Sequence, residues 1–235
     1  DQSGSYFVYG LPAYNGKKIQ KSFSINAVNG NGELSEGEDP ISIFENQSSI
    51  IPLQMNADGS DVDYKLSGKH EYYSKKETTA YAYSYLLTSI LGADYIDVDN
   101  NGPSDGDLGY WVKMDYVKYA DNYKWRAPFK GCLYSEGNPS TLEDDKGSYQ
   151  YGEKEIWYMS RIQTETHIAI FELDALQRED NYEAKGEFTD KNEVLDIGEK
   201  SGLRLMKIKL YEKAEYFNDP ETATPIQTVH FDYEY

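Results

Sequence analysis

The chain has 235 residues, 41 of them acidic and 23 basic, and its formal net charge at pH 7 is -18. A chain this acidic would be repelled by a nucleic-acid backbone and by an anionic membrane surface, so binding to either is not expected. Aromatic residues make up 14% of the sequence and include 23 tyrosines, whereas disordered acidic chains lack aromatics. Because tyrosine suits the half-buried surface of a β-sheet, the composition indicates a folded chain rich in sheet.

The N-terminus, the length of the apolar runs and the few cysteine and histidine residues further limit what kind of protein this is. The chain begins at Asp1 without an initiator methionine or a signal peptide, so we expect a processed product or a fragment of a longer protein. No apolar run approaches the roughly 20 residues of a membrane-spanning helix. Cys132 is the single cysteine, which excludes an internal disulfide, and the three histidines are too widely spaced to predict a zinc site.

Turn residues divide the first 78 residues into short apolar stretches, which predicts a β-rich segment with acidic loops. The Asn-Gly steps at 29–32 and the acidic stretch at 33–39 are typical of loops. The strand candidates of this segment are Tyr6–Tyr9, Phe23–Ile25, Ile41–Phe44 and Ile50–Leu53. We place a boundary after residue 78 and treat 79–235 as a second segment.

The second segment predicts a β-meander. Tyr81, Tyr83 and Tyr85 alternate as in a strand, although residues 83, 86, 87 and 90 also suit one face of a helix. We prefer the strand because the neighbouring sequence is β-rich. Further strands are predicted at Tyr110–Tyr119, Ile156–Ile162, His167–Leu173 and Leu203–Tyr211, the middle two forming a hairpin or a bent pair.

The last ten residues show the cleanest alternation in the chain and predict a strand that reaches Tyr235. An edge strand at 226–235 would pair with flanking regions of a longer polypeptide or with neighbouring chains. The fold class that we predict is mainly β, with extended antiparallel sheets arranged as a sandwich or a shell-like meander. Long polar loops and at most one or two short helices complete it.

The stretch from Asp97 to Asp107 carries the strongest functional signal. Calcium prefers six to eight oxygen ligands from a short loop that folds around it, and the order D-x-D-x-N-G-x-x-D matches most of an EF-hand loop. The candidate ligands are Asp97, Asp99, Asn101, the backbone carbonyl of Pro103, Asp105 and Asp107.

Leu108 stands where an EF-hand loop has its bidentate glutamate, and no flanking helices are evident. We therefore expect a structural calcium site between strands, and a plain Asp/Asn/Gly turn remains the alternative. Asp58–Asp63 is a poorer second candidate because its spacing is irregular. The acidic stretch at 143–145 is expected to be a solvated loop.

Two other functions remain open. Exposed Trp125 and Tyr123 would stack on sugar rings, which would make the chain a glycan-binding module with the ion stiffening its sheet. A glycosidase-like carboxylate enzyme is the third reading, because acidic pairs are plentiful. The sequence has no nucleophile elbow, phosphate loop, dinucleotide fingerprint or zinc-protease motif, and we predict no catalytic residues.

Within residues 80–235, five stretches carry a resemblance to known proteins: Tyr85–Ile90, Asp94–Gly102, Asp105–Gly109, Tyr123–Pro128 and Gly152–Tyr158. They resemble segments of very large, largely uncharacterised secreted or cell-surface proteins of Bacteroidota. Those proteins are in turn loosely similar to YD-repeat (Rhs-type) and insecticidal-toxin shell proteins, although this chain lacks the regular YD repeat. The resemblance implies export, by the type IX secretion route of that phylum, and a position inside a long polypeptide.

These observations together predict a non-catalytic scaffold segment of an exported or cell-surface protein, stabilised by calcium. Its partners would be the rest of the same polypeptide or neighbouring chains, with glycans as a further partner in the alternative reading. Neither nucleic acid nor membrane insertion is expected.

Overall fold

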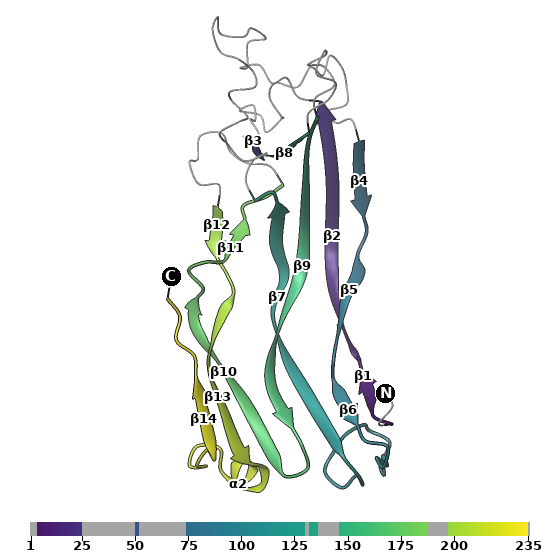
Figure 1. The fold of residues 1–235 in the computed structure, drawn as a ribbon, viewed down its shortest axis with the longest axis vertical. Helices are drawn as coiled ribbons and strands as arrows, with labels where there is room; N and C mark the ends of the chain where they lie inside the picture. Colours follow the sequence, from purple (N-terminus) through teal and green to yellow (C-terminus); the bar gives the residue numbers. More distant parts are fainter. Residues whose placement is uncertain are drawn as a thin grey trace, which may run out of the picture.

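The computed structural model describes residues 4–24, 50–51, 74–129, 132–135, 146–187 and 197–234. Within these residues the chain forms a 12-stranded antiparallel sheet, a separate pair of strands and one short helix (Figure 1). The predicted class, mainly β with extended antiparallel sheets, is confirmed. No helix in the described ranges is long and apolar enough to cross a membrane.

Two long strands form the middle of the sheet, β7 (Trp111–Ala127) and β9 (Lys146–Gln163). They pair antiparallel along most of their length, and the register shifts three times between Asp115 and Tyr123. Such bulges increase the right-handed twist of a strand pair. Figure 1 shows the consequence, because β7 and β9 cross near the middle of the molecule.

This twist changes the neighbours of β9 along its length. Its first half lies between β7 and β2 (Leu11–Ser24), whereas its last residues lie between β7 and β10 (His167–Gln177). The sheet therefore consists of one central pair with a group of strands on each side.

The group around β2 lies on the right in Figure 1. It contains β1 (Tyr6–Val8), β4 (Ser74–Thr78), β5 (Tyr81–Leu86) and β6 (Ser89–Leu91). Strand β6 pairs with β7 and thereby joins this group to the lower half of the central pair. Two short strands pair at the upper end, β3 (Ile50–Ile51) and β8 (Cys132–Ser135).

The group around β10 lies on the left in Figure 1. β10 pairs with β13 (Leu203–Glu212), and β13 pairs with β14 (Gln227–His230). The remaining elements are β11 (Tyr182–Ala184), β12 (Ile197–Lys200) and the helix α2 (Lys213–Asn218). Because β2 and β4 belong to the first 78 residues and pair into the same sheet as the later strands, the two sequence segments share one sheet.

Most strand predictions are confirmed. The ambiguous stretch at 81–91 forms β5 and β6, and the hairpin predicted from Ile156–Ile162 and His167–Leu173 is the β9–β10 pair. Ile41–Phe44 lies outside the described residues. The helix α2 follows directly after the predicted strand at Leu203–Tyr211, and the sequence pattern did not indicate it.

The prediction of a strand up to the last residue is wrong. β14 ends at His230, opposite Lys207 of β13. Beyond it, one backbone hydrogen bond joins the Phe231 amide to the Met206 carbonyl at 3.0 Å, and the Tyr233 hydroxyl donates to the Leu205 carbonyl at 2.9 Å. Residues 231–234 do not form a strand.

The buried apolar side chains gather in two places along the sheet. Ile19, Tyr149 and Tyr151 are buried where β2 pairs with β9. Trp111 and Ile168, with 2% and 0% of their surface exposed, are buried near the lower end. Each half of the long sheet therefore has its own small core.

Glu155 connects three strands near the crossing. Its side-chain oxygens accept hydrogen bonds from Lys118 Nζ at 2.6 Å, from the Tyr14 amide at 2.9 Å and from Trp157 Nε1 at 3.2 Å. Its backbone carbonyl accepts one from the Tyr83 hydroxyl at 2.8 Å. Burial opposes ionisation of this carboxyl, but the hydrogen bonds from Lys118, Tyr14 and Trp157 outweigh it and lower the pKa of Glu155.

Replacing Glu155 by glutamine should lower the free energy of unfolding at pH 7 by about 1–3 kcal/mol, since charge-assisted hydrogen bonds are lost. With a folded-state pKa below its ordinary value of 4.5, the ionised side chain stabilises the fold above that value. This contribution disappears as the pH falls through the folded-state pKa. The difference between wild type and Glu155→Gln should therefore shrink below pH 4.5 in urea unfolding.

The matched control is Glu172→Gln, which removes a partly exposed ion pair with Lys209 on β13. It should change the free energy of unfolding by less than about 1 kcal/mol. Equal losses in the two variants at pH 7 would show that Glu155 has no special role at the crossing.

Candidate metal centre

The Asp-rich stretch lies in the connection between β6 and β7, at the lower end of the sheet (Figure 1). Ile96 and Leu108 close it as an isolated antiparallel bridge, with amide-to-carbonyl distances of 2.9 and 3.1 Å. The Gly92 amide also donates to the Tyr110 carbonyl at 2.7 Å. Residues 97–107 therefore form a closed loop on a narrow two-stranded base.

Left-handed backbone conformations fold this loop. Asn100 has φ 60°, and Gly102, Gly106 and Gly109 have φ of 81°, 106° and 82°. Glycine adopts this region without steric cost, and asparagine tolerates it better than most residues. A Cβ atom on Gly109 would overlap the Asp94 carbonyl, whereas one on Gly102 would have no atom within 4 Å.

The loop brings three carboxylates together. One oxygen from each of Asp97, Asp99 and Asp107 lies within 4.8 Å of the others. Asp107 is buried with 6% of its surface exposed, Asp97 is half-buried and Asp99 is exposed. The group thus runs from the interior of the loop to its surface.

Asp107 organises the interior of the loop. Its Oδ1 accepts a hydrogen bond from the Val98 amide at 3.0 Å, and its Oδ2 accepts from the Ser104 amide and the Tyr95 hydroxyl, both at 2.9 Å. The hydrogen bond from the Val98 amide lowers the pKa of Asp107. Burial raises this pKa, but the bonds from Ser104 and Tyr95 lower it further, and the net shift is downward. Burial and the bond to Asp107 raise the pKa of Tyr95 to about 12. The aspartate is therefore ionised and the tyrosine protonated at neutral pH.

Asp97 has an unsatisfied oxygen. Its Oδ2 accepts a hydrogen bond from the Gly102 amide at 3.0 Å. Its Oδ1 is buried and has no hydrogen-bond partner in the part of the chain that the structure describes. A buried carboxylate oxygen without a partner is costly, and a cation is the partner that a carboxylate prefers.

The remaining predicted ligands are placed differently. The Asn101 side-chain Nδ2 donates a hydrogen bond to Asp99 Oδ2 at 2.6 Å, and the Asn101 backbone amide donates one to Asp99 Oδ1 at 3.3 Å. Asn101 therefore orients that carboxylate. Pro103 is half-buried at the turn. Asp105 accepts a hydrogen bond from Lys213 Nζ and does not belong to the group of three.

Lys213 fastens the loop to the opposite side of the sheet. It is buried at the start of α2, where its Nζ also donates to the Thr164 carbonyl at 3.2 Å and lies 4.8 Å from the Trp111 ring centroid. The contact between Asp105 and Lys213 links the Asp-rich loop to α2 and to the β9–β10 turn. Sequence reasoning missed Lys213, because residues 108 positions apart show no local pattern.

The two aromatic candidates are partly buried. The Trp125 Nε1 lies 3.3 Å from Asn15 Oδ1, and the Tyr123 hydroxyl lies 2.8 Å from Asn181 Oδ1. Both side chains keep part of their surface exposed, and their stacking on a ligand stays a prediction. Asp58–Asp63, the acidic stretch at 143–145 and the side chain of Cys132 lie outside the described residues.

Comparisons with known proteins give no family for this chain. No protein-family model matches it, and neither a curated protein nor a solved structure does. Its chemistry is therefore inferred from its own residues. The three carboxylates, one with a buried unsatisfied oxygen, are a candidate site for a hard cation, because such a cation prefers oxygen ligands.

Two glycine variants test the geometry of the loop. Gly102→Ala should cost about 1–2 kcal/mol of stability, the penalty for a Cβ in the left-handed region. Gly109→Ala should cost clearly more, because its Cβ also overlaps the Asp94 carbonyl at the base of the loop. The measurement is the free energy of unfolding in urea, and equal costs for the two variants would contradict the described loop base.

Proposed function

We propose that this chain is a non-catalytic scaffold segment of a large exported or cell-surface protein, and that a calcium ion in the Asp-rich loop stabilises it. The observation that carries the proposal is the buried, unpartnered Asp97 Oδ1, which lies in a group of three carboxylates. Like charges this close destabilise the fold unless a cation lies between them.

Asp97, Asp99 and Asp107 would hold the ion. Calcium takes six to eight oxygens, so backbone carbonyls and water would complete its coordination. The ion would neutralise the crowded carboxylates and connect Asp99, on the surface, with Asp107 in the interior of the loop. Magnesium is less suitable because it demands near-ideal octahedral geometry and keeps several waters.

A structural role fits the position of the loop better than a sensor role. Its base is closed by backbone hydrogen bonds, and Asp105 attaches it to Lys213 on the other side of the sheet. In the described residues no flanking helix pair would open on ion binding, as in a calcium sensor. The ion would hold one conformation and so reinforce the lower end of the central strand pair.

The scaffold role and the exported location rest on the form of the sheet and on the resemblance. Many large apolar side chains are exposed on it, among them Tyr6, Tyr85 and Val117 with 67%, 58% and 55% of their surface exposed. A sheet of this kind favours contact with further protein, as in a long polypeptide built from successive β-segments. Extracellular calcium concentrations also suit a structural site of modest affinity.

Thermal unfolding with excess calcium and then with a chelator tests the proposal. An ion that binds only the folded state adds about 2.7 kcal/mol at a hundredfold excess over its Kd. For a chain of this size that corresponds to about 5–10 °C in Tm. The double variant Asp97→Asn/Asp99→Asn should not respond, and Asp232→Asn, an exposed acid on the tail after β14, should respond like the wild type.

A wild-type Tm that is the same in calcium and in chelator would show that the Asp-rich stretch is only a turn. A double variant that still gains stability from calcium would place the ion elsewhere in the chain. Either result would overturn the proposed site.

A further inference from the structure

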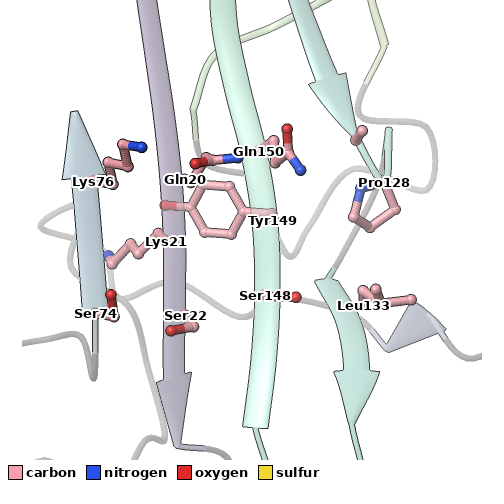
Figure 2. Close-up of a pocket in the computed structure, with 11 residues that line it drawn as sticks. Gln20, Lys21, Ser22, Ser74, Lys76, Pro128, Leu133, Ser148, Tyr149 and Gln150 are labelled. Carbon is pink, nitrogen blue, oxygen red and sulfur yellow. The ribbon is translucent and has the colours of Figure 1, made fainter. Parts of the chain in front are cut away.

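A hollow of about 600 Å³ lies on the sheet at the end opposite the Asp-rich loop (Figure 2). It extends across β4, β2 and β9 toward β8 and the end of β7. Pockets for small ligands in proteins have volumes of about 300–1,000 Å³. The hollow is therefore large enough for a ligand of a few rings.

Two rows of side chains cross this face of the sheet. Residues directly opposite each other in antiparallel strands point to the same face. The register places Ser74, Ser22, Ser148 and Leu133 in one row across β4, β2, β9 and β8. The adjoining row consists of Lys76, Gln20, Gln150 and Ala127, across β4, β2, β9 and β7.

Several polar side chains of these rows have no hydrogen-bond partner among the described residues. In the part of the chain that the structure describes, the side chains of Ser22, Ser148, Gln20, Gln150 and Lys76 take part in no hydrogen bond or ion pair. The serine and glutamine side chains are nevertheless half-buried. Hydroxyl and amide groups both donate and accept hydrogen bonds, so the rows offer alternating donors and acceptors.

The charge of the hollow differs from that of the chain. Among the described residues its lining contains Lys21 and Lys76 and none that is acidic, although the chain carries a net charge of -18. Lys76 is exposed on the edge strand β4. A negative group on a ligand would therefore meet one accessible ammonium here and no carboxylate from this described lining.

An aromatic ring lies next to the second row. Trp125 and Lys18 are both opposite Gly152, one pair along from the Gln20–Gln150 pair on the same face. A Cβ on Gly152 would lie 2.7 Å from Cε2 and Cζ2 of Trp125, so the indole covers this glycine. Trp125 keeps part of its surface exposed.

We infer that this face binds a short glycan. The serine and glutamine rows would bond the sugar hydroxyls, and a sugar ring would pack on the exposed part of Trp125, whose apolar face suits its C–H groups. Lys76, at the other end of the glutamine row, favours a chain that contains an acidic sugar. This inference goes beyond the scaffold role and does not depend on the calcium ion.

The test begins with an array of neutral and uronic-acid oligosaccharides of three to six units. The strongest binder is then titrated by calorimetry into the wild-type chain. We expect binding, and we expect Gln20→Ala/Gln150→Ala to weaken it at least tenfold. Gln227→Ala, an exposed glutamine on β14 far from the hollow, is the matched control and should bind like the wild type.

Lys76→Met provides a second measurement with little risk to the fold, because this side chain is exposed. It should weaken binding of a uronic-acid oligosaccharide severalfold and leave a neutral one unchanged. Absence of binding to every sugar on the array would overturn the inference. So would a binding sugar whose affinity is the same in Gln20→Ala/Gln150→Ala, provided that this variant has the wild-type Tm.

Discussion

The pairing of β7 with β9 is the interaction on which the other strands depend. Every strand group of the large sheet reaches this pair, through β2, β6, β8 or β10. Three register shifts between Asp115 and Tyr123 increase its twist, so the two halves of β9 have different neighbours. At the crossing, the carboxylate of Glu155 holds the strands together by hydrogen bonds. Its oxygens accept bonds from Tyr14 of β2, Lys118 of β7 and Trp157 of β9.

The two proposed sites lie at opposite ends of this pair and use different chemistry. At the lower end, the chain folds back on left-handed residues and gathers carboxylates, one of which keeps a buried unsatisfied oxygen. At the upper end, serine, glutamine and lysine side chains line a hollow, and none of the described lining residues is acidic. In the proposed account, a cation would offset the repulsion among the acids at the lower end, whereas the polar hollow at the upper end would bind a neutral or acidic glycan.

Local patterns predicted much of the fold and part of the candidate site. Alternation identified β5, β7, β10 and β13, and the spacing from Asp97 to Asp107 identified a loop that does bring three of its acids together. Strand β2 was largely missed, because its middle, Asn15 to Lys18, is polar and contains a glycine. Its position between β9 and the strands β4 and β5 is set by pairing with residues distant in sequence, which a local pattern cannot predict.

Long-range contacts explain the other differences. Asp105 fitted a ligand position by spacing, yet it pairs with Lys213, 108 residues later in the chain. The last strand ends at His230, and the Tyr233 hydroxyl then bonds to the Leu205 carbonyl of β13, a contact that the alternating pattern does not reveal. The two rows of the hollow lie on strands from separate parts of the sequence, β2, β4, β7, β8 and β9, so only the register reveals them.

Terbium luminescence is the most direct test of the central claim, that one cation binds among Asp97, Asp99 and Asp107. Terbium replaces calcium at oxygen sites, and Tyr95, whose hydroxyl lies 2.9 Å from Asp107 Oδ2, is placed to sensitise its emission. The account predicts emission that saturates at one ion per chain, declines on addition of calcium and is lost in Asp97→Asn/Asp99→Asn. Emission that does not saturate, or that is equally strong in this variant, would contradict it.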